Sequence, residues 1–196
     1  MTEADVPLRL GIFGGTFDPP HIGHLVVAQD ALESLTLDRL LVIPAGRPPH
    51  RAAAFAEAER LEFARLAFAG DERIEVSDVE VRREGPSWTV DTLEWARTEL
   101  KPSELFLIVG ADQLGTLGGW REPERILRLA RLAVMTRNGE TLAETEYPYE
   151  MIEVTRVDLS STQVRKRLRE GRSIRYMVPE HVRPAVERAW SARSTE

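Results

Sequence analysis

GIFGGTFDPPHIGH, residues 11–24, joins a strand, a glycine-rich turn and the first turn of a helix in a single run. Residues 8–13, which are mostly apolar, predict a short buried strand, and Gly14 and Gly15 let the backbone turn there without a Cβ in the way. The two prolines that follow suit the first positions of a helix. Because exposed N–H groups and the positive end of a helix dipole favour anions, this junction predicts a phosphate site.

Two histidines stand in the first turn of the expected helix. His21 and His24 are three positions apart, so both can point at one bound group. Donors that converge on one phosphorus favour phosphate chemistry over mere storage. Two alternatives remain open at this point. One is a structural turn with solvated histidines; the other is a metal site, which is weaker because Asp18 precedes two prolines and no H-E-x-x-H or cysteine partner exists.

The commoner nucleotide motifs are missing from the sequence. No segment reads G-x-x-x-x-G-K-S/T, and the spacing of Gly11, Gly14 and Gly15 does not fit G-x-G-x-x-G. The chain therefore contains neither a P-loop nor a dinucleotide fingerprint.

A second segment, DLSSTQVRKR at residues 158–167, also begins a helix. Ser160 and Gln163 form a capping box, and Gly171 suits the position just after a helix end. The helix opens with hydroxyls and then carries Arg165 and further basic residues. A solvated basic face is the plain alternative, yet a cation one turn inside a hydroxyl-rich N-terminus is also a way to hold a triphosphate.

Together the two segments resemble the nucleotidyltransferases of the HxGH type, and among them the bacterial nicotinate-mononucleotide adenylyltransferase family. GGTFDPPHIGH is similar to the amino-terminal signature of that family, and LSSTQVR is similar to its carboxy-terminal I-S-S-T-x-x-R, with Leu159 in place of isoleucine. Three further blocks match in the same order. They are residues 47–51 (RPPHR for K-P-P-H-K), residues 86–93 (PSWTVDTL for P-S-Y-T-I-D-T-L), and Gly110-Ala111-Asp112 with Trp120.

The resemblance assigns roles on the ATP side of the site. It implies that the catalytic groups are His21 and His24, which contact the α-phosphate, and Arg165, which holds the β and γ phosphates. Magnesium would be bound mainly through the phosphates of ATP and keep several waters, with no metal-ligating residue of the protein. The expected ATP- and phosphate-binding residues are Gly14, Gly15, Thr16, Phe17, Arg47, His50, Ser161 and Thr162.

The resemblance also describes the mononucleotide side. It implies that Trp120 stacks on the pyridine ring, that Thr89 and nearby amides receive the carboxylate, and that Asp112 contacts the nucleotide. Trp88 replaces the usual tyrosine of the family, which keeps an aromatic surface but loses the phenol oxygen. The implied reaction joins ATP and nicotinate mononucleotide to give nicotinate adenine dinucleotide and pyrophosphate, a step of NAD biosynthesis.

Length and composition agree with one enzyme domain. We expect a single nucleotidyltransferase domain over residues 1–196, with a helical segment at about 160–192 that carries the second phosphate-binding motif. The chain has no cysteine and a formal net charge of −6, and it shows neither a leader-like start nor an apolar run long enough for a membrane span. We therefore expect a cytoplasmic protein that acts on small molecules and binds neither nucleic acid nor membrane; a homo-oligomer is possible.

Apolar runs alternate with helical patterns along the chain. This alternation predicts an α/β, Rossmann-like, doubly wound, mostly parallel sheet with helices on both faces. Ligands of such sheets bind outside the carboxyl ends of the strands, where the strand order reverses. The expected strands are residues 8–13, 39–43, 74–81, 105–109, 132–135 and 152–155, and the expected helices are 22–34, 56–69, 89–100, 123–129, 160–170 and 179–192.

Two rival functions remain to be compared. Another enzyme of the HxGH type, such as a pantetheine-phosphate adenylyltransferase, would explain both signature segments but would not call for the 86–93 block or Trp120. A non-catalytic nucleotide sensor could keep the phosphate cradle, but it would not need both histidines and Arg165. Pyrophosphate release with ATP and several candidate acceptors separates the three.

Overall fold

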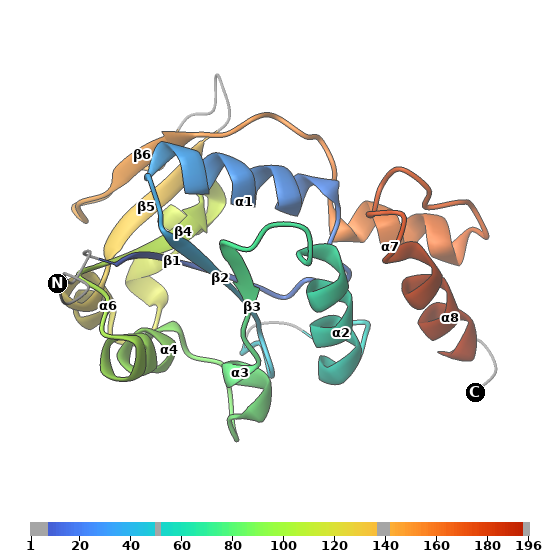
Figure 1. Cartoon of the computed structure of the whole chain (residues 1–196), viewed down its shortest axis with the longest axis horizontal. Coiled ribbons are helices and arrows are strands. Elements are labelled where there is room, and N and C mark those ends of the chain that lie inside the picture. Colours follow the sequence, from blue (N-terminus) through green and yellow to red (C-terminus); the bar gives the residue numbers. More distant parts are fainter. Residues whose placement is uncertain (1–7, 50–51, 137–141, 194–196) are drawn as a thin grey trace, which may run out of the picture.

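The strands form a single sheet in which every neighbouring pair described is parallel. The computed structural model describes residues 8–49, 52–136 and 142–193. The strand order β3-β2-β1-β4-β5-β6 reverses beside β1, which confirms the doubly wound α/β fold (Figure 1). The strands are β1 (Arg9–Gly15), β2 (Arg39–Pro44), β3 (Ile74–Val76), β4 (Glu104–Gly110), β5 (Arg131–Thr136) and β6 (Glu150–Glu153).

Helices cover both faces of the sheet, as expected. One face packs against α1 (Ile22–Ser34), α2 (Glu57–Ala67), α7 (Ser161–Arg169) and α8 (Arg183–Arg193). The other packs against α4 (Thr89–Trp95) with its π-helical continuation η1 (Ala96–Leu100), α5 (Ala111–Leu114) and α6 (Pro123–Leu129). In Figure 1, α7 and α8 lie together at the end of the molecule where α2 is found, so the second motif reaches the sheet from that end.

Two apolar clusters hold these layers together, because successive side chains of a strand point to opposite faces. In β4, Phe106 and Ile108 join the cluster under α1, whereas Leu105, Leu107 and Val109 join the cluster under α4 and α6. Because both faces of this strand are buried, polar and apolar residues do not alternate along it. This explains the continuous apolar run FLIV in the sequence.

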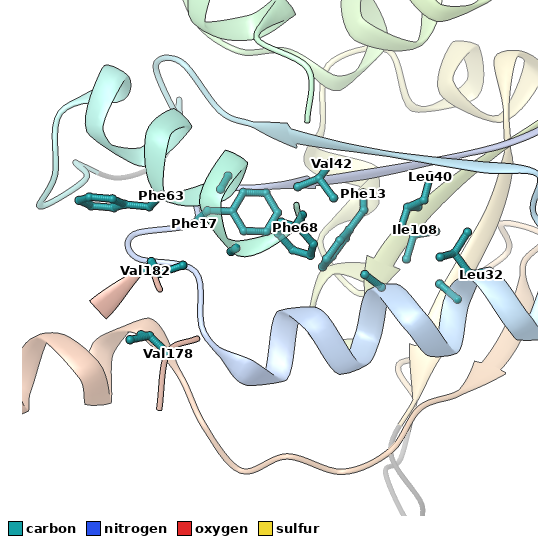
Figure 2. Packing of buried hydrophobic residues seen from close by; sticks show 14 of the residues in the cluster. Phe13, Phe17, Leu32, Leu40, Val42, Phe63, Phe68, Ile108, Val178 and Val182 are labelled. Atoms are coloured by element: carbon teal, nitrogen blue, oxygen red, sulfur yellow. The ribbon is translucent and has the colours of Figure 1, made fainter. Parts of the chain in front are cut away.

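The turn after β1 is anchored in the first cluster. Figure 2 shows Phe13, Phe17 and Phe68 side by side between the strands and α1. The ring centroids of Phe13 and Phe17 are 5.6 Å apart and those of Phe17 and Phe68 are 6.0 Å apart, both edge to face. The phosphate turn predicted from the sequence therefore has an aromatic side chain locked into the core.

The predicted strand at 74–81 is wrong in its second half. β3 ends at Val76, and residues Val79–Arg82 form a short helix, α3. The Ser77 hydroxyl accepts a hydrogen bond from the amide of Val79 at 3.4 Å, a local bond that competes with a continued ladder. The chain at Glu80 then comes back against Gly46, where a Cβ would lie only 2.3 Å from the Glu80 carbonyl oxygen.

Other element boundaries also differ from the prediction. β6 ends at Glu153, before the predicted end at residue 155, because the amide of Thr155 donates to the Asp30 carboxylate of α1 at 2.6 Å instead of to a strand. The α8 helix begins at Arg183, four residues later than predicted. Elements α3, α5 and the 3-10 turn η2 (Leu117–Gly119) are too short to show a periodic pattern, and the sequence did not predict them. The single domain over residues 1–196 stays a prediction.

Candidate active site

The strand order places the candidate site at the carboxyl ends of β1 and β4, the neighbours between which the order reverses. β1 ends with Gly14 and Gly15, and β4 ends at Gly110, directly before Ala111 and Asp112 open α5. Two of the blocks singled out in the sequence thus emerge side by side from the sheet. Asp112 is exposed at that edge.

The turn after β1 differs from the glycine turn that the sequence suggested. Gly14 and Gly15 are the last two residues of the strand, and the left-handed position falls on Phe17, whose φ is 48°. A Cβ on Gly15 would come within 3.0 Å of the Phe17 ring, so the glycine lets that ring fold back toward the core. A Cβ on Gly14 would meet nothing within 4 Å, so the space beside it is open at the site.

The two histidines lie against each other at the start of α1. Their ring centroids are 3.7 Å apart, and the His24 ring also packs edge-on to Phe17, with 5.0 Å between centroids. His21 is the N-cap residue and is buried, whereas His24 is partly buried one turn further along the helix. The structure therefore brings both predicted catalytic histidines to one point beside the turn.

A backbone hydrogen bond fixes which nitrogen of His24 can act as a donor. The amide of His21 donates to Nδ1 of His24 at 3.0 Å, so Nδ1 carries no proton. Burial, and after it the charge of His21, hold the pKa of His24 well below its ordinary value of 6.5. The ring is therefore neutral at pH 7 with its proton on Nε2, and it presents an Nε2–H donor for a phosphate oxygen.

We expect the free energy of unfolding to fall as the pH drops below about 6.5. In that range His24 stays neutral in the folded protein and becomes protonated when the chain unfolds. The unfolded state then binds more protons, so stability increases with pH between the lowered folded pKa and the unfolded pKa. Urea titrations at about pH 7.5 and pH 5.5 measure the change; the decrease should be smaller in His24→Asn, and an equal decrease in both proteins would contradict this assignment.

The second signature segment meets the first at the start of α1. The Arg165 guanidinium donates from Nη1 to the carbonyl oxygen of Asp18 at 2.6 Å, across 147 positions of sequence. The Ser161 hydroxyl donates to the carbonyl oxygen of Pro19 at 2.8 Å. Nη2 of Arg165 also lies 3.2 Å from the Thr162 hydroxyl oxygen, so Arg165 bridges the two segments.

The predicted capping box begins α7. The Ser160 hydroxyl accepts from the Gln163 amide at 3.2 Å, and the Gln163 side chain accepts from the Ser160 amide at 2.7 Å. The box sets where the helix starts, and so places the hydroxyls of its first turn beside the phosphate turn.

Asp18 is the buried acid behind this junction. It is 3% exposed, and its two carboxylate oxygens accept from the amides of Ala54 and Phe55, both at 2.8 Å. One of them lies 3.3 Å from Nη1 of Arg165. Asp18 thus fixes the position of both the chain before α2 and the Arg165 guanidinium. The sequence motif did not predict this structural role.

A pocket of about 250 Å³ lies on the other side of the reversal point, between the loop before α4 and the segment after α5. The Trp120 indole N–H donates to the Thr116 hydroxyl at 3.3 Å, and the Arg121 guanidinium lies 5.8 Å from the Trp88 ring centroid. The pocket thus combines two indoles with a positive charge. Its lining residues are Pro49, Ser87, Trp88, Thr89, Gln113, Thr116, Trp120, Arg121 and Ile126.

Three of the four residues predicted to bind the mononucleotide line this pocket, and Asp112 does not. Gln113, Thr116 and Arg121 also line it, and sequence reasoning missed them. Arg121 directly follows Trp120, and that adjacency was the available signal.

Arg47 connects the two halves of the site. Its amide donates to the Ser87 hydroxyl at 3.2 Å, and its carbonyl accepts from the Ser87 amide at 3.0 Å. The loop after β2 is therefore tied to the edge of the aromatic pocket, while the Arg47 side chain is exposed. His50, predicted to bind ATP, and Arg51 lie outside the described residues.

A larger hollow, of about 350 Å³, does not fit the predicted substrates. It lies beside the carboxyl end of α1, away from the histidines, and Asp30, Glu33 and Glu153 contribute carboxylates to its wall. These three carboxylates outnumber the one guanidinium of the wall, that of Arg156, and repel phosphate groups, so the smaller pocket is the better substrate site.

The described residues hold neither a cluster of metal ligands nor a helix that could cross a membrane. No three or more His, Cys, Asp or Glu side chains within residues 8–49, 52–136 and 142–193 gather as a metal-ligand set. In the same ranges, no helix combines the length and apolar character that a membrane crossing needs.

Comparison with known families supports the relationship suggested by the motifs. A family model described as cytidylyltransferase-like matches residues 12–167, a span that contains both signature segments. A Thermus thermophilus protein named "Probable nicotinate-nucleotide adenylyltransferase" is 45% identical over 181 residues, which cover 92% of this chain and 97% of that protein. A Gemmatimonas aurantiaca protein of the same name is 46% identical over 185 residues, covering 89% and 88% respectively.

A solved structure agrees in its fold. Plasmodium falciparum nicotinic acid mononucleotide adenylyltransferase complexed with NaAD superposes with a TM-score of 0.78, covering 92% of this chain and 95% of that one, at 17% identity. At that identity the likeness concerns the fold.

Proposed function

This chain belongs to the cytidylyltransferase-like family and, within it, to the nicotinate-nucleotide adenylyltransferases, and on that premise we propose how its own residues transfer an adenylyl group from ATP to nicotinate mononucleotide. The observation that supports this assignment most strongly is the junction of the two signature segments. Arg165 and Ser161 hydrogen-bond the backbone of Asp18 and Pro19, directly before the two histidines. These bonds bring the start of α7 and the Arg165 guanidinium to the edge of the sheet where the histidines lie, and we propose that the triphosphate binds at this edge.

The reaction needs no covalent bond to the protein. A phosphate oxygen of the mononucleotide attacks the α-phosphorus of ATP, the bond from that phosphorus to the bridging oxygen breaks, and pyrophosphate leaves with the electron pair. Negative charge grows on the α-phosphate oxygens and on the leaving group. Catalysis then depends on positioning and on donors aimed at that charge.

We assign the donors from their positions. The Nε2–H of His24 and the side chain of His21 face the α-phosphate, with Thr16 and the amides of Gly14 and Gly15 around it. Arg165, with the Ser161 and Thr162 start of α7, binds the β and γ phosphates. The guanidinium suits that task because its planar fork can donate to two phosphate oxygens at once.

We propose that a divalent cation, Mg²⁺, arrives with ATP. The carboxylate of Asp18, the acid closest to the junction in sequence, is already occupied by two amides and a guanidinium. This donor set fits a cation that is coordinated mainly by phosphate oxygens and water. When bound, the cation would supply positive charge on the leaving pyrophosphate.

The aromatic pocket is the proposed mononucleotide site. Trp120 offers a stacking surface for the pyridine ring, and Trp88 provides a second indole where the family usually has tyrosine. Thr89 is the first residue of α4, where backbone amides and the hydroxyl can receive a carboxylate, and Arg121 adds a positive charge. Asp112, exposed at the end of β4, stays as a proposed contact of the nucleotide.

We also propose that the reaction takes place in the cytoplasm. A homo-oligomer remains a prediction.

An assay of pyrophosphate release tests the function directly. The purified protein is supplied with ATP, Mg²⁺ and one of three acceptors: nicotinate mononucleotide, nicotinamide mononucleotide or phosphopantetheine. We expect the fastest release with the nicotinate form, with an equal amount of dinucleotide product. Release with phosphopantetheine alone would contradict the proposal, and so would ATP binding without turnover on any acceptor.

Within that assay, Trp120→Ala and Thr89→Val should change the acceptor preference differently. Trp120→Ala should weaken the binding of both pyridine mononucleotides, because stacking on an indole does not depend on whether the ring carries a carboxylate or a carboxamide. In the wild type a carboxylate can accept from every donor around it, whereas a carboxamide leaves N–H groups unpaired at a cost of about 1–3 kcal/mol each. Thr89→Val removes one of those donors, so it should slow the reaction mainly with nicotinate mononucleotide. The ratio of the rates with the two acceptors should then decrease. An equal wild-type preference, or an unaltered ratio in Thr89→Val, would show that the carboxylate binds elsewhere.

A further inference from the structure

Arg60 of α2 is a buried charged residue, and no pattern in the sequence predicts its burial. The residue is 1% exposed and is among the largest fully buried side chains described. In an amphipathic helix an arginine ordinarily marks the solvated face, so its burial needs a compensating set of hydrogen bonds. Burial lowers the pKa of Arg60 and the nearby Asp18 and Glu57 partly offset that shift, and a guanidinium stays charged at neutral pH.

The compensating bonds all go to backbone carbonyl oxygens. Nη1 donates to Thr16 at 2.9 Å and to Ala45 at 2.5 Å. Nη2 donates to Gly46 at 2.7 Å, and Nε donates to Phe55 at 3.2 Å. One side chain thereby joins three chain segments that are separate in the sequence.

Each of those segments belongs to the candidate site. Thr16 lies in the phosphate turn after β1. Gly46 precedes Arg47, whose backbone is bonded to Ser87 at the edge of the aromatic pocket. The Phe55 amide holds the Asp18 carboxylate, which in turn lies 3.3 Å from Arg165.

The planar fork of a guanidinium is what this position requires. Carbonyl oxygens from three segments cannot hydrogen-bond one another, because none of them carries a proton. Arginine offers donors in fixed directions within one plane, so it sets the separation of the segments as well as satisfying them. A lysine ammonium at the end of a flexible stem could not reach the same four oxygens together.

We propose that Arg60 is a positioning residue for adenylyl transfer: by bonding Thr16, Gly46 and Phe55 it fixes the phosphate turn at a set distance from the mononucleotide pocket. It touches neither substrate. This inference rests on the proposed function, because the distance that matters is the one between the two reacting phosphates.

Arg60→Met tests the proposal, because methionine keeps much of the apolar volume and removes every donor. We expect kcat to fall about 10²-fold, the loss typical of a small misplacement of reacting groups, while KM for each substrate changes by less than about threefold. The KM values should change little in Arg60→Met because the groups that contact the substrates are still present. Thermal unfolding is measured on the same samples.

Arg97 provides a matched control. It too donates to backbone carbonyls, Leu129 at 2.7 Å and Pro102 at 3.1 Å, but it does so at the amino ends of β4 and β5, the opposite edge of the sheet. Arg97→Met should lower the melting temperature and leave kcat within about twofold of wild type. The contrast separates loss of position at the site from loss of stability in general.

Arg60→Lys keeps the experiment decisive if Arg60→Met fails to fold, because lysine restores the charge without the fork. We expect its kcat to stay at least about tenfold below wild type. A wild-type kcat in either folded variant, with the wild type active in the same assay, would overturn the role of Arg60. An inactive wild type would instead contradict the proposed function, so the two failures are distinguishable.

Discussion

Replacing His24 with alanine should lower kcat about 10²- to 10³-fold, the range known for removal of one donor that faces a developing negative charge. KM for ATP should change far less, because the Nε2–H contact strengthens only as charge builds on the α-phosphate. The structure supplies the reason for choosing this nitrogen: the His21 amide donates to Nδ1 and leaves Nε2 as the protonated one. Steady-state kinetics under saturating mononucleotide measure both constants.

Two conservative variants sharpen that prediction. An asparagine at position 24 can still accept from the His21 amide but has no group near Nε2, so His24→Asn should be nearly as slow as the alanine variant. His24→Gln places an amide close to Nε2 and should recover part of the rate. Near-normal turnover in His24→Asn would show that the ring acts only as a helix cap. His21→Ala should resemble His24→Ala.

Arg165→Lys should raise KM for ATP and lower kcat, each by roughly tenfold or more, the equivalent of losing a charge-assisted hydrogen bond. In the structure the guanidinium donates to the Asp18 carbonyl and reaches the Thr162 hydroxyl with its other terminal nitrogen. A lysine could keep one of these contacts but could not also present a planar fork to phosphate oxygens. The ATP dependence of the initial rate measures the effect.

Arg167→Lys is the matched control for that variant. Its side chain lies on the same helix but donates to the Ser173 carbonyl, away from the phosphate turn. We expect its ATP kinetics to remain within about twofold of wild type. If Arg165→Lys were unchanged and Arg167→Lys impaired, the triphosphate would lie against a different part of α7 than we propose.

The sequence predicted the fold well because its long elements carry strong patterns. The expected helix at residues 22–34 matches α1, and the apolar runs for the central strands match within two residues. Prediction failed where local hydrogen bonds compete with a pattern. Residues 74–81 are rich in the β-branched residues typical of a strand, yet Ser77 and the return of the chain to Gly46 end β3 early.

The sequence indicates the segments of the candidate site but not the contacts between them. Each signature segment has a local signal, a strand–turn–helix junction in one case and a capping box in the other. Nothing in the sequence says that Arg165 donates to the Asp18 carbonyl, because that contact depends on where α7 packs against the end of the sheet. The role of Arg60 could not be predicted from the sequence, because its four acceptors are backbone oxygens, which every residue type has.

A crystal structure of the protein with nicotinate adenine dinucleotide bound would show whether both halves of the proposed site hold the product as assigned. We expect the phosphate derived from ATP to lie within hydrogen-bond distance of His24 Nε2, and the pyridine ring to stack on Trp120 with its carboxylate at the start of α4. The dinucleotide would then span the carboxyl ends of β1 and β4. A product whose phosphates lie away from both histidines, or whose pyridine ring lies outside the pocket of Trp88 and Trp120, would contradict this assignment.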